Sequence, residues 1–298
     1  MIDLHTHSAA SDGNYTPSAL VAEAAKRGLT ALALTDHDTI GGLGEAARAA
    51  LENGIRFIPG IELEIAWNQG GDFHLLGLGI GRPSPAFEAA VEELARRRRE
   101  RNLEIVERMN KAGIGVSYDE VLAFAGAYPL DGSQGGGPLN AGTSGGGHSI
   151  GRPHFAAFLA KRKIVKNREQ AFLRYLGKGK PFFIPKAGLE FERAVEVIRG
   201  SGGIAVLAHP MSLYTAWGRL PGLIKTLKER GLDGLEAWHP NASVSDCKRL
   251  EDLGKESGLF VTAGSDFHGE GRPDRNLGIT AGGKKIDDSF LPPLPLPG

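Results

Sequence analysis

The first twelve residues, 1–12, read M-I-D-L-H-T-H-S-A-A-S-D, and the rest of the chain is interpreted from them. Ile2 and Leu4 alternate with polar residues, a pattern that predicts a short strand close to the first residue. Side chains two positions apart on a strand project from the same face. His5 and His7 therefore aim two imidazoles at one point, which is the convergence that nitrogen ligands need around a divalent metal. An isolated H-x-H pair is equally compatible with two polar residues at a strand end.

The composition is that of a folded, water-soluble chain. Its 298 residues, 41% hydrophobic and 23% charged, are enough for one large α/β barrel or two ordinary domains. The formal net charge of zero excludes a global field that would recruit nucleic acid or an anionic membrane, so local charge must hold any anionic substrate. A single cysteine, Cys247, excludes an internal disulfide and a thiolate metal cluster. Because the sequence shows neither a membrane-length apolar run nor a signal-peptide layout, we expect a cytoplasmic protein without a membrane partner.

Apolar strands and amphipathic helices alternate in the first part of the chain. The expected helices span residues 17–27 and 42–53, and the expected strands span residues 29–35, 56–61 and 73–80. This order predicts parallel strands joined by crossover helices. Active-site residues of such sheets and barrels lie at the carboxyl ends of the strands, where His37 and Glu62 fall.

The pattern changes between residues 82 and 179, which we expect to form an inserted helical lid domain in a barrel made of residues 1–81 and 180–298. The expected helices of the insertion span residues 87–112, 120–125, 152–161 and 169–176. Its arginine-rich stretch 95–102 predicts a solvated helix face, with the alternative that one or two arginines hold a substrate phosphate. Residues 126–151, rich in Gly, Ser, Asn and Pro, predict a flexible loop that lacks the context of a phosphate-binding P-loop.

The alternation of strands and helices resumes after residue 180. The expected strands span residues 203–208, 234–237 and 259–263, and the expected helices span residues 191–201, 220–231 and 245–257. A histidine follows each of these strands, namely His209, His239 and His268, the last together with Asp266. We expect the proline-rich tail 292–297 to be disordered.

Nine potential metal ligands lie at or near the expected strand ends. They are His5, His7, Asp12, His37, Glu62, His74, His209, Asp266 and His268. Each alone has an ordinary explanation as a core histidine or a capping carboxylate, but together at one end of a barrel they indicate a metal centre. Nine ligands exceed one tetrahedral site and suit two or three ions with a bridging carboxylate. The mixed nitrogen and oxygen donors favour Mn²⁺, Zn²⁺ or Fe²⁺ over Ca²⁺ or Mg²⁺.

Six motifs, taken in order, resemble those of the PHP (polymerase and histidinol phosphatase) family of metallophosphoesterases. They are D-L-H-T-H-S at 3–8, S-D-G at 11–13, T-D-H-D at 35–38, G-I-E at 60–62, A-H-P at 208–210 and G-S-D-F-H at 264–268. The G-R-P-H at 151–154 and the W-H-P at 238–240 resemble the stand-alone members that act on nucleoside 3′,5′-bisphosphates or on short RNA 5′ ends. The resemblance implies an α/β fold, a distorted (β/α)₇ TIM-like barrel with a metal cluster at the carboxyl ends of its strands.

The resemblance also assigns the nine residues to three divalent ions, with Mn²⁺ as the first expectation and Zn²⁺ or Fe²⁺ as alternatives. The first ion is assigned to His5, His7, Glu62 and Asp266. A second ion is assigned to Glu62 as a bridge, His74 and His209. The third ion is assigned to Asp12, His37 and His268. The glycine-rich stretch before Arg152 is longer than the family pattern leads us to expect.

These features predict metal-dependent hydrolysis of a phosphomonoester of a small nucleotide by in-line attack of a metal-bound hydroxide. Arg152 and His154 are predicted to bind substrate phosphate at a helix start, or are ordinary helix-start residues. We expect Arg152 and His239 to take part in catalysis, His239 by contacting phosphate or protonating the leaving oxygen, unless its role is structural. The alternatives are a 5′-to-3′ exonuclease on short RNA and a non-catalytic metal-binding regulatory module.

Overall fold

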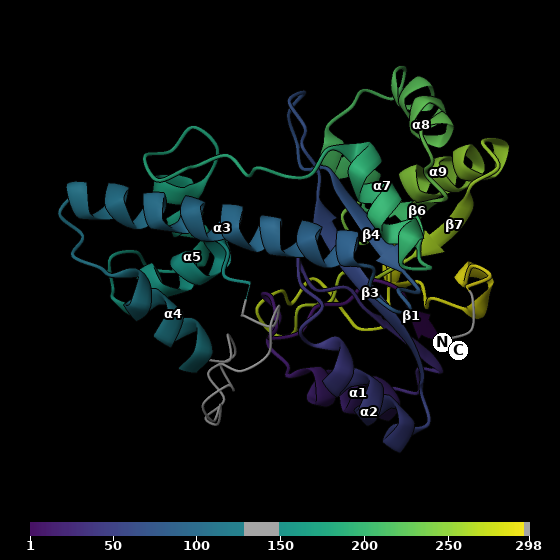
Figure 1. Ribbon diagram of the computed structural model, residues 1–298, viewed down its shortest axis with the longest axis horizontal. Helices are drawn as coiled ribbons and strands as arrows, with labels where there is room; N and C mark the ends of the chain where they lie inside the picture. The colour runs from purple at the N-terminus through teal and green to yellow at the C-terminus, as the bar shows by residue number, and fades with distance from the viewer. Residues whose placement is uncertain (128–148, 295–298) are drawn as a thin grey trace.

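A computed structural model describes residues 1–127 and 149–294, and within them seven strands form one sheet in the order in which they occur in the chain. The strands lie together on one side of the molecule, and helices surround them (Figure 1). Their bounds are β1 Ile2–Asp3, β2 Ala31–Leu34, β3 Arg56–Glu64, β4 His74–Leu78, β5 Ile204–Leu207, β6 Gly234–Trp238 and β7 Phe260–Ala263.

The two edges of the sheet meet through main-chain contacts just beyond β1 and β7. Thr6 and Phe267 form a parallel bridge, and the N–H of His7 donates to the carbonyl of Phe267 at 2.9 Å. The buried carboxylate of Asp3 reinforces this seam by accepting hydrogen bonds from the N–H of Ser265 at 3.0 Å and from its hydroxyl at 2.5 Å. The sheet is therefore a nearly closed seven-stranded barrel, as expected.

Helices cover the barrel and build a separate lobe beside it. The α-helices are α1 Pro17–Lys26, α2 Leu43–Asn53, α3 Pro85–Lys111, α4 Tyr118–Ala127, α5 Arg152–Lys161, α6 Arg168–Ala171, α7 Phe191–Gly200, α8 Leu220–Glu229 and α9 Val244–Glu256. The short helical turns are η1 Phe172–Leu176, η2 Pro210–Leu213, η3 Ala281–Gly283 and η4 Asp288–Phe290. Local sequence explains the starts: Thr16 caps α1 with Pro17 in its first turn, and Ser84 caps α3 in the same way.

The direction of β4 contradicts the parallel order expected from the sequence. β4 pairs antiparallel with both β3 and β5. The connection 65–73, which is described throughout, joins β3 to β4 without a helix, and so short a link returns the chain antiparallel. β3 also continues to Glu64, so Glu62 lies inside the strand rather than after it. The reversal puts His74, the first residue of β4, opposite Glu64 at the end of β3.

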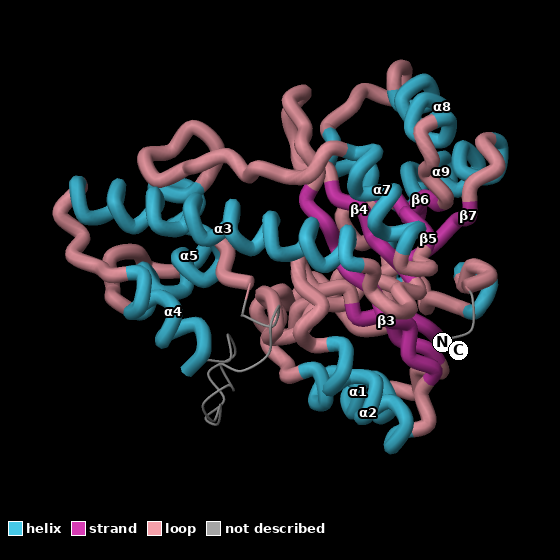
Figure 2. Tube along the Cα trace, viewed as in Figure 1, coloured by secondary structure: helices cyan, strands magenta, loops and turns pink. Residues whose placement is uncertain are grey.

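Three apolar cores hold the molecule together. The largest fills the barrel and packs the inner faces of α7, α8 and α9, and another joins α1 and α2 to β2. The third lies in the lobe of α4, α5 and α6, which Figure 2 shows as helices and loops away from the strands. Most of the predicted flexible loop 126–151 and the end of the proline-rich tail lie outside the described residues.

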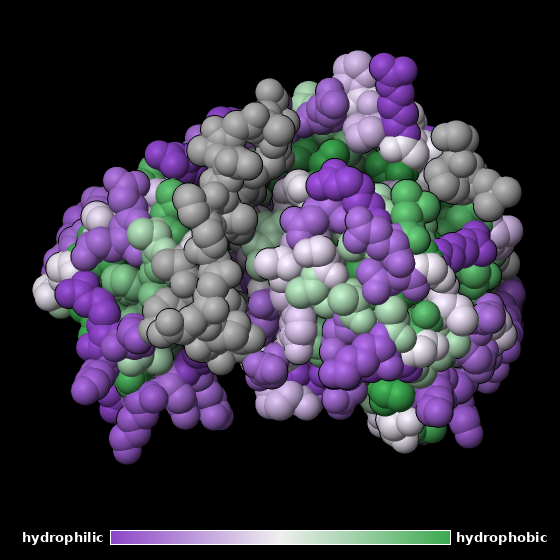
Figure 3. All heavy atoms as spheres, turned by 90° about the horizontal axis from the view of Figure 1, so that it is seen from below, coloured by the Kyte–Doolittle hydropathy of each residue, from purple (hydrophilic) through white to green (hydrophobic). Residues whose placement is uncertain are grey.

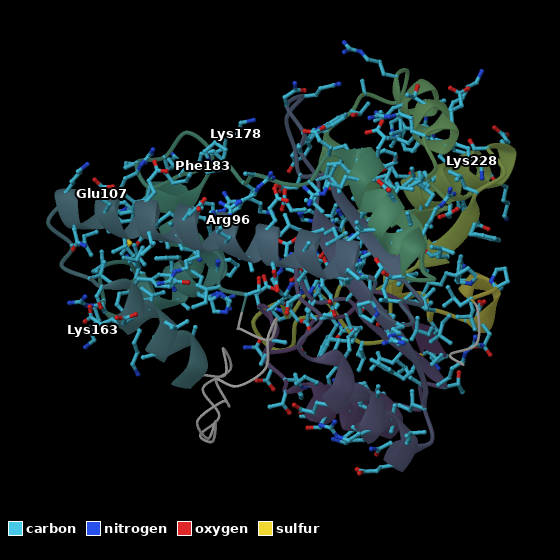
Figure 4. The ribbon with its side chains drawn as sticks, in the orientation of Figure 1. Arg96, Glu107, Lys163, Lys178, Phe183 and Lys228 are labelled. Carbon is cyan, nitrogen blue, oxygen red and sulfur yellow. The ribbon has the colours of Figure 1, made fainter. Side chains whose placement is uncertain are left out.

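Helix α3 belongs to both parts of the molecule. Phe87, Val91 and Leu94 near its start pack in the barrel core, whereas Ile105 and Met109 near its end pack in the helical core. Residues 177–190, which lead from the helical lobe to α7, run back along the same helix past Lys178 and Phe183 (Figure 4). Arginines of α3 anchor that segment, because Arg108 donates to the carbonyl of Phe183 at 3.1 Å.

The described helices include none that combines the length and the apolar character needed to cross a bilayer.

Seen from below, hydrophilic side chains cover much of both lobes, and apolar residues are scattered among them (Figure 3).

The seam of the barrel leaves no room for a side chain at Gly264. A Cβ there would lie 2.3 Å from the Cβ of His5 and 2.6 Å from Oε1 of Glu236. We expect Gly264→Ala to lower the free energy of unfolding by about 1–3 kcal/mol through overpacking, measured by thermal and urea unfolding.

Gly222→Ala is the matched control, because Gly222 lies in α8 and a Cβ there meets nothing within 4 Å. Alanine in a helix interior should leave stability unchanged or raise it slightly. Equal stability of the two variants would contradict a tightly packed seam.

Candidate metal centre

Four side-chain atoms converge inside the barrel near its seam. Nε2 of His5 lies 3.4 Å from Oε2 of Glu62 and 3.5 Å from Oδ1 of Asp266, and Nε2 of His7 lies 3.4 Å and 3.1 Å from the same two oxygens. Ligand atoms about 2.1 Å from a tetrahedral ion are about 3.4 Å apart, so these spacings fit one metal ion. Among the described residues, Nε2 of His5, Nε2 of His7 and Oε2 of Glu62 are buried without a hydrogen-bond partner. Buried polar atoms are otherwise nearly always paired, so a cation is the natural partner of this set.

A second group gathers around the other carboxylate oxygen of Glu62. Oε1 lies 2.8 Å from Nδ1 of His74 and 2.9 Å from Nε2 of His209, and those two nitrogens are 3.3 Å apart. Glu62 thus faces both groups, which is the position of a bridging carboxylate.

A third group lies against His7 on the side of the loop that follows β1. Oδ1 of Asp12 is 3.3 Å from Nε2 of His268 and 4.0 Å from Nε2 of His37. The rings of His7 and His268 stack with centroids 4.2 Å apart. The structure therefore brings together all nine residues singled out from the sequence, in overlapping groups that could hold metal ions.

The backbone is strained where it carries these side chains. Five non-glycine residues in the described chain have positive φ, and three of them are Asp38, His209 and Asp266, with φ of 52°, 27° and 51°. Such conformations are unfavourable for residues with a Cβ and persist only where surrounding structure enforces them. Their concentration here is typical of a functional site.

Burial and neighbouring charges shift the pKa values of the candidate ligands in different directions, and against the effect of burial the carboxylates of Glu64 and Glu62 raise the pKa of His74 to about 10. Burial and the neighbouring His268 lower the pKa of His7 to about 3, so its imidazole is neutral. Burial alone would raise the pKa of the Glu62 carboxyl, but His37, His74 and His5 hold that pKa well below its ordinary value. Neutral imidazole and ionised carboxylate are the forms that bind a metal.

Buried carboxylates behind the ligands were missed by our sequence reasoning. Glu236 accepts from Nδ1–H of His5 at 3.0 Å and from the N–H of His209 at 2.7 Å. Glu64 lies 2.9 Å from Nε2 of His74, and Asp36 accepts from the hydroxyl of Ser8. Such partners fix the orientation and tautomer of metal-ligating histidines. The available signal was an acidic residue at the centre of a fully buried strand, as Glu236 is in β6.

His239 is placed beside a candidate ligand. Its Nε2 lies 3.2 Å from Oδ2 of Asp266, and its Nδ1 accepts from the N–H of Asn241 at 3.1 Å. The buried guanidinium of Arg275 contacts both Asp266 and His239. Arg275 was not singled out from the sequence.

Arg152 and His154 are placed at the start of α5. Nη1 of Arg152 donates to the carbonyl of Leu176 at 3.3 Å, and its guanidinium lies over the ring of Phe183. Nδ1 of His154 accepts from the N–H of Gly151, and burial lowers the pKa of His154 to about 4. His154 is therefore neutral and caps the helix, so any contact with phosphate must come from its Nε2 side.

The sequence is similar to those of known proteins. The PHP domain profile matches residues 3–125, and a 5′-3′ exoribonuclease from Haemophilus influenzae is 36% identical, covering 89% of this chain and 89% of the relative. The chain belongs to the PHP family. A 3′,5′-nucleoside bisphosphate phosphatase from Chromobacterium violaceum is 34% identical over 94% of this PHP chain and 91% of its own length.

Solved structures share the PHP fold of this chain. An amidohydrolase from Chromobacterium violaceum, with bound sulfate and no metal, superimposes with a TM-score of 0.80 at 33% identity, covering 97% of this chain and 92% of the other. As a PHP protein with the complete set of candidate ligands, the chain is a metal-dependent phosphoesterase.

Glu236 provides a test of the metal centre that does not alter a candidate ligand. We expect Glu236→Gln to lower the affinity for Mn²⁺ or Zn²⁺ about 10- to 100-fold, because the carboxylate that orients His5 is lost. Competition with a chelator measures this affinity.

Glu256→Gln, at an exposed position at the end of α9, is the control and should leave metal affinity unchanged. Wild-type affinity in Glu236→Gln would show that Glu236 does not support the metal site.

Proposed function

We propose that this protein hydrolyses a phosphomonoester of a small nucleotide, such as a nucleoside 3′,5′-bisphosphate, at a centre of two or three divalent ions. The observation that carries the proposal is the convergence on one point of buried atoms of His5, His7 and Glu62 that have no hydrogen bond among the described residues. The name of the Chromobacterium violaceum relative supports the substrate class. Mn²⁺ is the first candidate metal, and Zn²⁺ and Fe²⁺ are the alternatives.

The proposed ligand sets are those that the resemblance to PHP proteins implies. The first ion is assigned to His5, His7, Glu62 and Asp266. The second is assigned to Glu62, His74 and His209. The third is assigned to Asp12, His37 and His268. When bound, such ions lower the pKa of a water and neutralise the oxygens of a phosphoryl group.

The chain's own residues do the rest of the chemistry in this proposal. His239 lies beside Asp266, with its Nε2 3.2 Å from Oδ2 of that residue, and is assigned to contact phosphate or to protonate the leaving oxygen. Arg152 supplies a cation for substrate phosphate from the start of α5, where its guanidinium lies over the ring of Phe183. His154 orders the first turn of the same helix by accepting from Gly151.

We also propose that residues 82–179 form an inserted helical lid domain on a barrel made of residues 1–81 and 180–298. A separate apolar core supports this division, and it includes Ile105, Phe155 and Leu176. The same core extends to Phe182 and Ile184 in the segment that returns to the barrel.

Phosphate release by metal-stripped protein tests the proposed function. The substrates are adenosine 3′,5′-bisphosphate, adenosine 5′-monophosphate, histidinol phosphate and a 5′-phosphorylated trinucleotide, each without metal and with Mn²⁺ or Zn²⁺ restored. We expect metal-dependent turnover of the bisphosphate. Turnover of the trinucleotide alone would indicate the exonuclease activity instead, and turnover of none of them would refute both.

Arg152→Ala tests the proposed phosphate contact. Loss of the guanidinium should raise KM for the nucleotide about 10- to 100-fold, because a charge-assisted contact to phosphate contributes about 1.5–3 kcal/mol. Steady-state kinetics with restored metal measure the change.

Arg162→Ala is the matched control, since Arg162 also lies over a ring, that of Phe158, and donates to the carbonyl of Gly115. Its KM should remain that of the wild type. An equal rise of KM in both variants would indicate loss of helical packing rather than of a phosphate contact.

A further inference from the structure

The side chain of Arg275 is buried beside the metal centre, in the segment that follows His268. It is 1% exposed, and the N–H of the same residue donates to the carbonyl of Arg272 at 2.9 Å. Three residues further along, the N–H of Gly278 donates to Oδ2 of Asp3 at 2.7 Å, which ties this segment to the seam of the barrel. Closure of the barrel therefore helps to fix the position of Arg275.

All three nitrogens of the Arg275 guanidinium have partners. Nη1 contacts Oδ2 of Asp266 and lies 3.1 Å from Nε2 of His239. Nη2 donates to Oδ1 of Asn241 at 2.6 Å, and Nε donates to Oδ2 of Asp274 at 3.2 Å. A buried guanidinium that is engaged on every nitrogen is held by the protein, which distinguishes it from one that is free to bind a substrate phosphate.

The two carboxylate oxygens of Asp266 have different surroundings. Oδ1 lies 3.1 Å from Nε2 of His7 and 3.5 Å from Nε2 of His5, within the first group of candidate ligands. Oδ2 contacts Arg275 and His239 instead. With Oδ2 occupied in this way, Asp266 offers one oxygen to a metal ion and keeps that oxygen close to the two histidines.

The charge of Arg275 also offsets a concentration of buried carboxylates. Oε2 of Glu62, Oε1 of Glu236 and Oδ1 of Asp266 lie 3.4, 3.0 and 3.5 Å from ring nitrogens of His5. Like charges so close together repel one another, and burial makes each of them costly. Histidines are neutral when they ligate a metal, whereas a guanidinium keeps its positive charge. Arg275 can thus hold Asp266 in place both before and after an ion binds.

We propose that Arg275 is a positioning residue of the metal centre, which holds Oδ1 of Asp266 toward the first ion by occupying Oδ2. The inference rests on the proposed function, because it takes an ion to lie at the first ligand set. Asn241 and Asp274 fix the plane of the guanidinium, so the direction of its N–H groups, and not its charge alone, sets the orientation of Asp266.

Removal of the guanidinium should weaken metal binding. Arg275→Met keeps an unbranched side chain and removes the charge and the donors. We expect it to lower the affinity for Mn²⁺ or Zn²⁺ about 10- to 100-fold, as loss of a partner that orients a metal ligand does. Competition with a chelator measures the affinity, and a wild-type value would overturn the inference.

Arg275→Lys provides the same test if Arg275→Met does not fold. Lysine keeps the charge but cannot donate in three fixed directions, so we expect a smaller loss of metal affinity than in Arg275→Met. Wild-type affinity in Arg275→Lys would show that the planar guanidinium is not needed and would overturn the inference.

Arg199→Met is the matched control, because it removes a guanidinium from another aspartate. Nη2 of Arg199 lies 2.6 Å from Oδ1 of Asp233, which directly precedes β6, whereas His239 directly follows that strand. The pair therefore lies at the end of the strand away from the metal centre, and its loss should leave metal affinity unchanged. An equal loss of affinity in both variants would attribute the effect to lost stability and overturn the inference.

Steady-state kinetics separate positioning from substrate binding. With adenosine 3′,5′-bisphosphate and saturating metal, Arg275→Met should lower kcat by about tenfold or more and leave KM nearly unchanged, because Asp266 is misplaced while the groups that bind substrate remain. A rise of KM with unchanged kcat would make Arg275 a substrate ligand and overturn the assignment.

Failure of the inference and failure of the proposed function are distinguishable, because metal affinity does not depend on the substrate. Weaker metal binding by Arg275→Met, with no turnover of any nucleotide by the wild type, would refute the proposed function and keep the role of Arg275. A lower melting temperature of metal-free Arg275→Met with wild-type metal affinity and kcat would show that Arg275 supports only the fold, and would overturn the inference.

Discussion

The closure of the barrel between the segments after β1 and β7 is the constraint on which the rest of the structure depends. One main-chain hydrogen bond, from His7 to Phe267, and the buried carboxylate of Asp3 join the two ends of the sheet. Burial raises the pKa of Asp3 to about 6, against the effect of its hydrogen bonds from Ser265 and Gly278, so the join places an acid in an apolar environment. The same join brings the H-x-H of the first loop within ligand distance of Asp266.

Closure and chemistry therefore use the same residues. Gly264 can approach His5 so closely because it has no side chain, and Asp266 follows it in a strained backbone conformation. The carboxylate that orients His5 comes from β6, the neighbouring strand. A barrel that closed one residue out of register would separate these groups. The geometry of the metal centre therefore depends on closure of the seam in the correct register.

Much of this could be predicted from sequence, for identifiable reasons. Most of the candidate ligands follow apolar strands, and parallel strands carry such residues to one edge, so the gathering of those residues could be expected from the pattern. The direction of β4 could not be predicted in this way, because an apolar run has the same pattern in either direction and only the short connection 65–73 reverses it. The contacts of Glu236 with His5 and His209 depend on neighbours far along the chain, and its position at the centre of a buried strand is the one local sign of them.

Helix α3 fixes the distance between the barrel and the helical lobe. Its 27 residues span about 40 Å, with one end packed in the barrel core and the other in the helical core. The helical lobe cannot rotate as a rigid body against the barrel unless α3 bends or one of the two cores opens. A molecule that contacted both the barrel and the helical lobe would consequently meet a separation set by the rise of one helix.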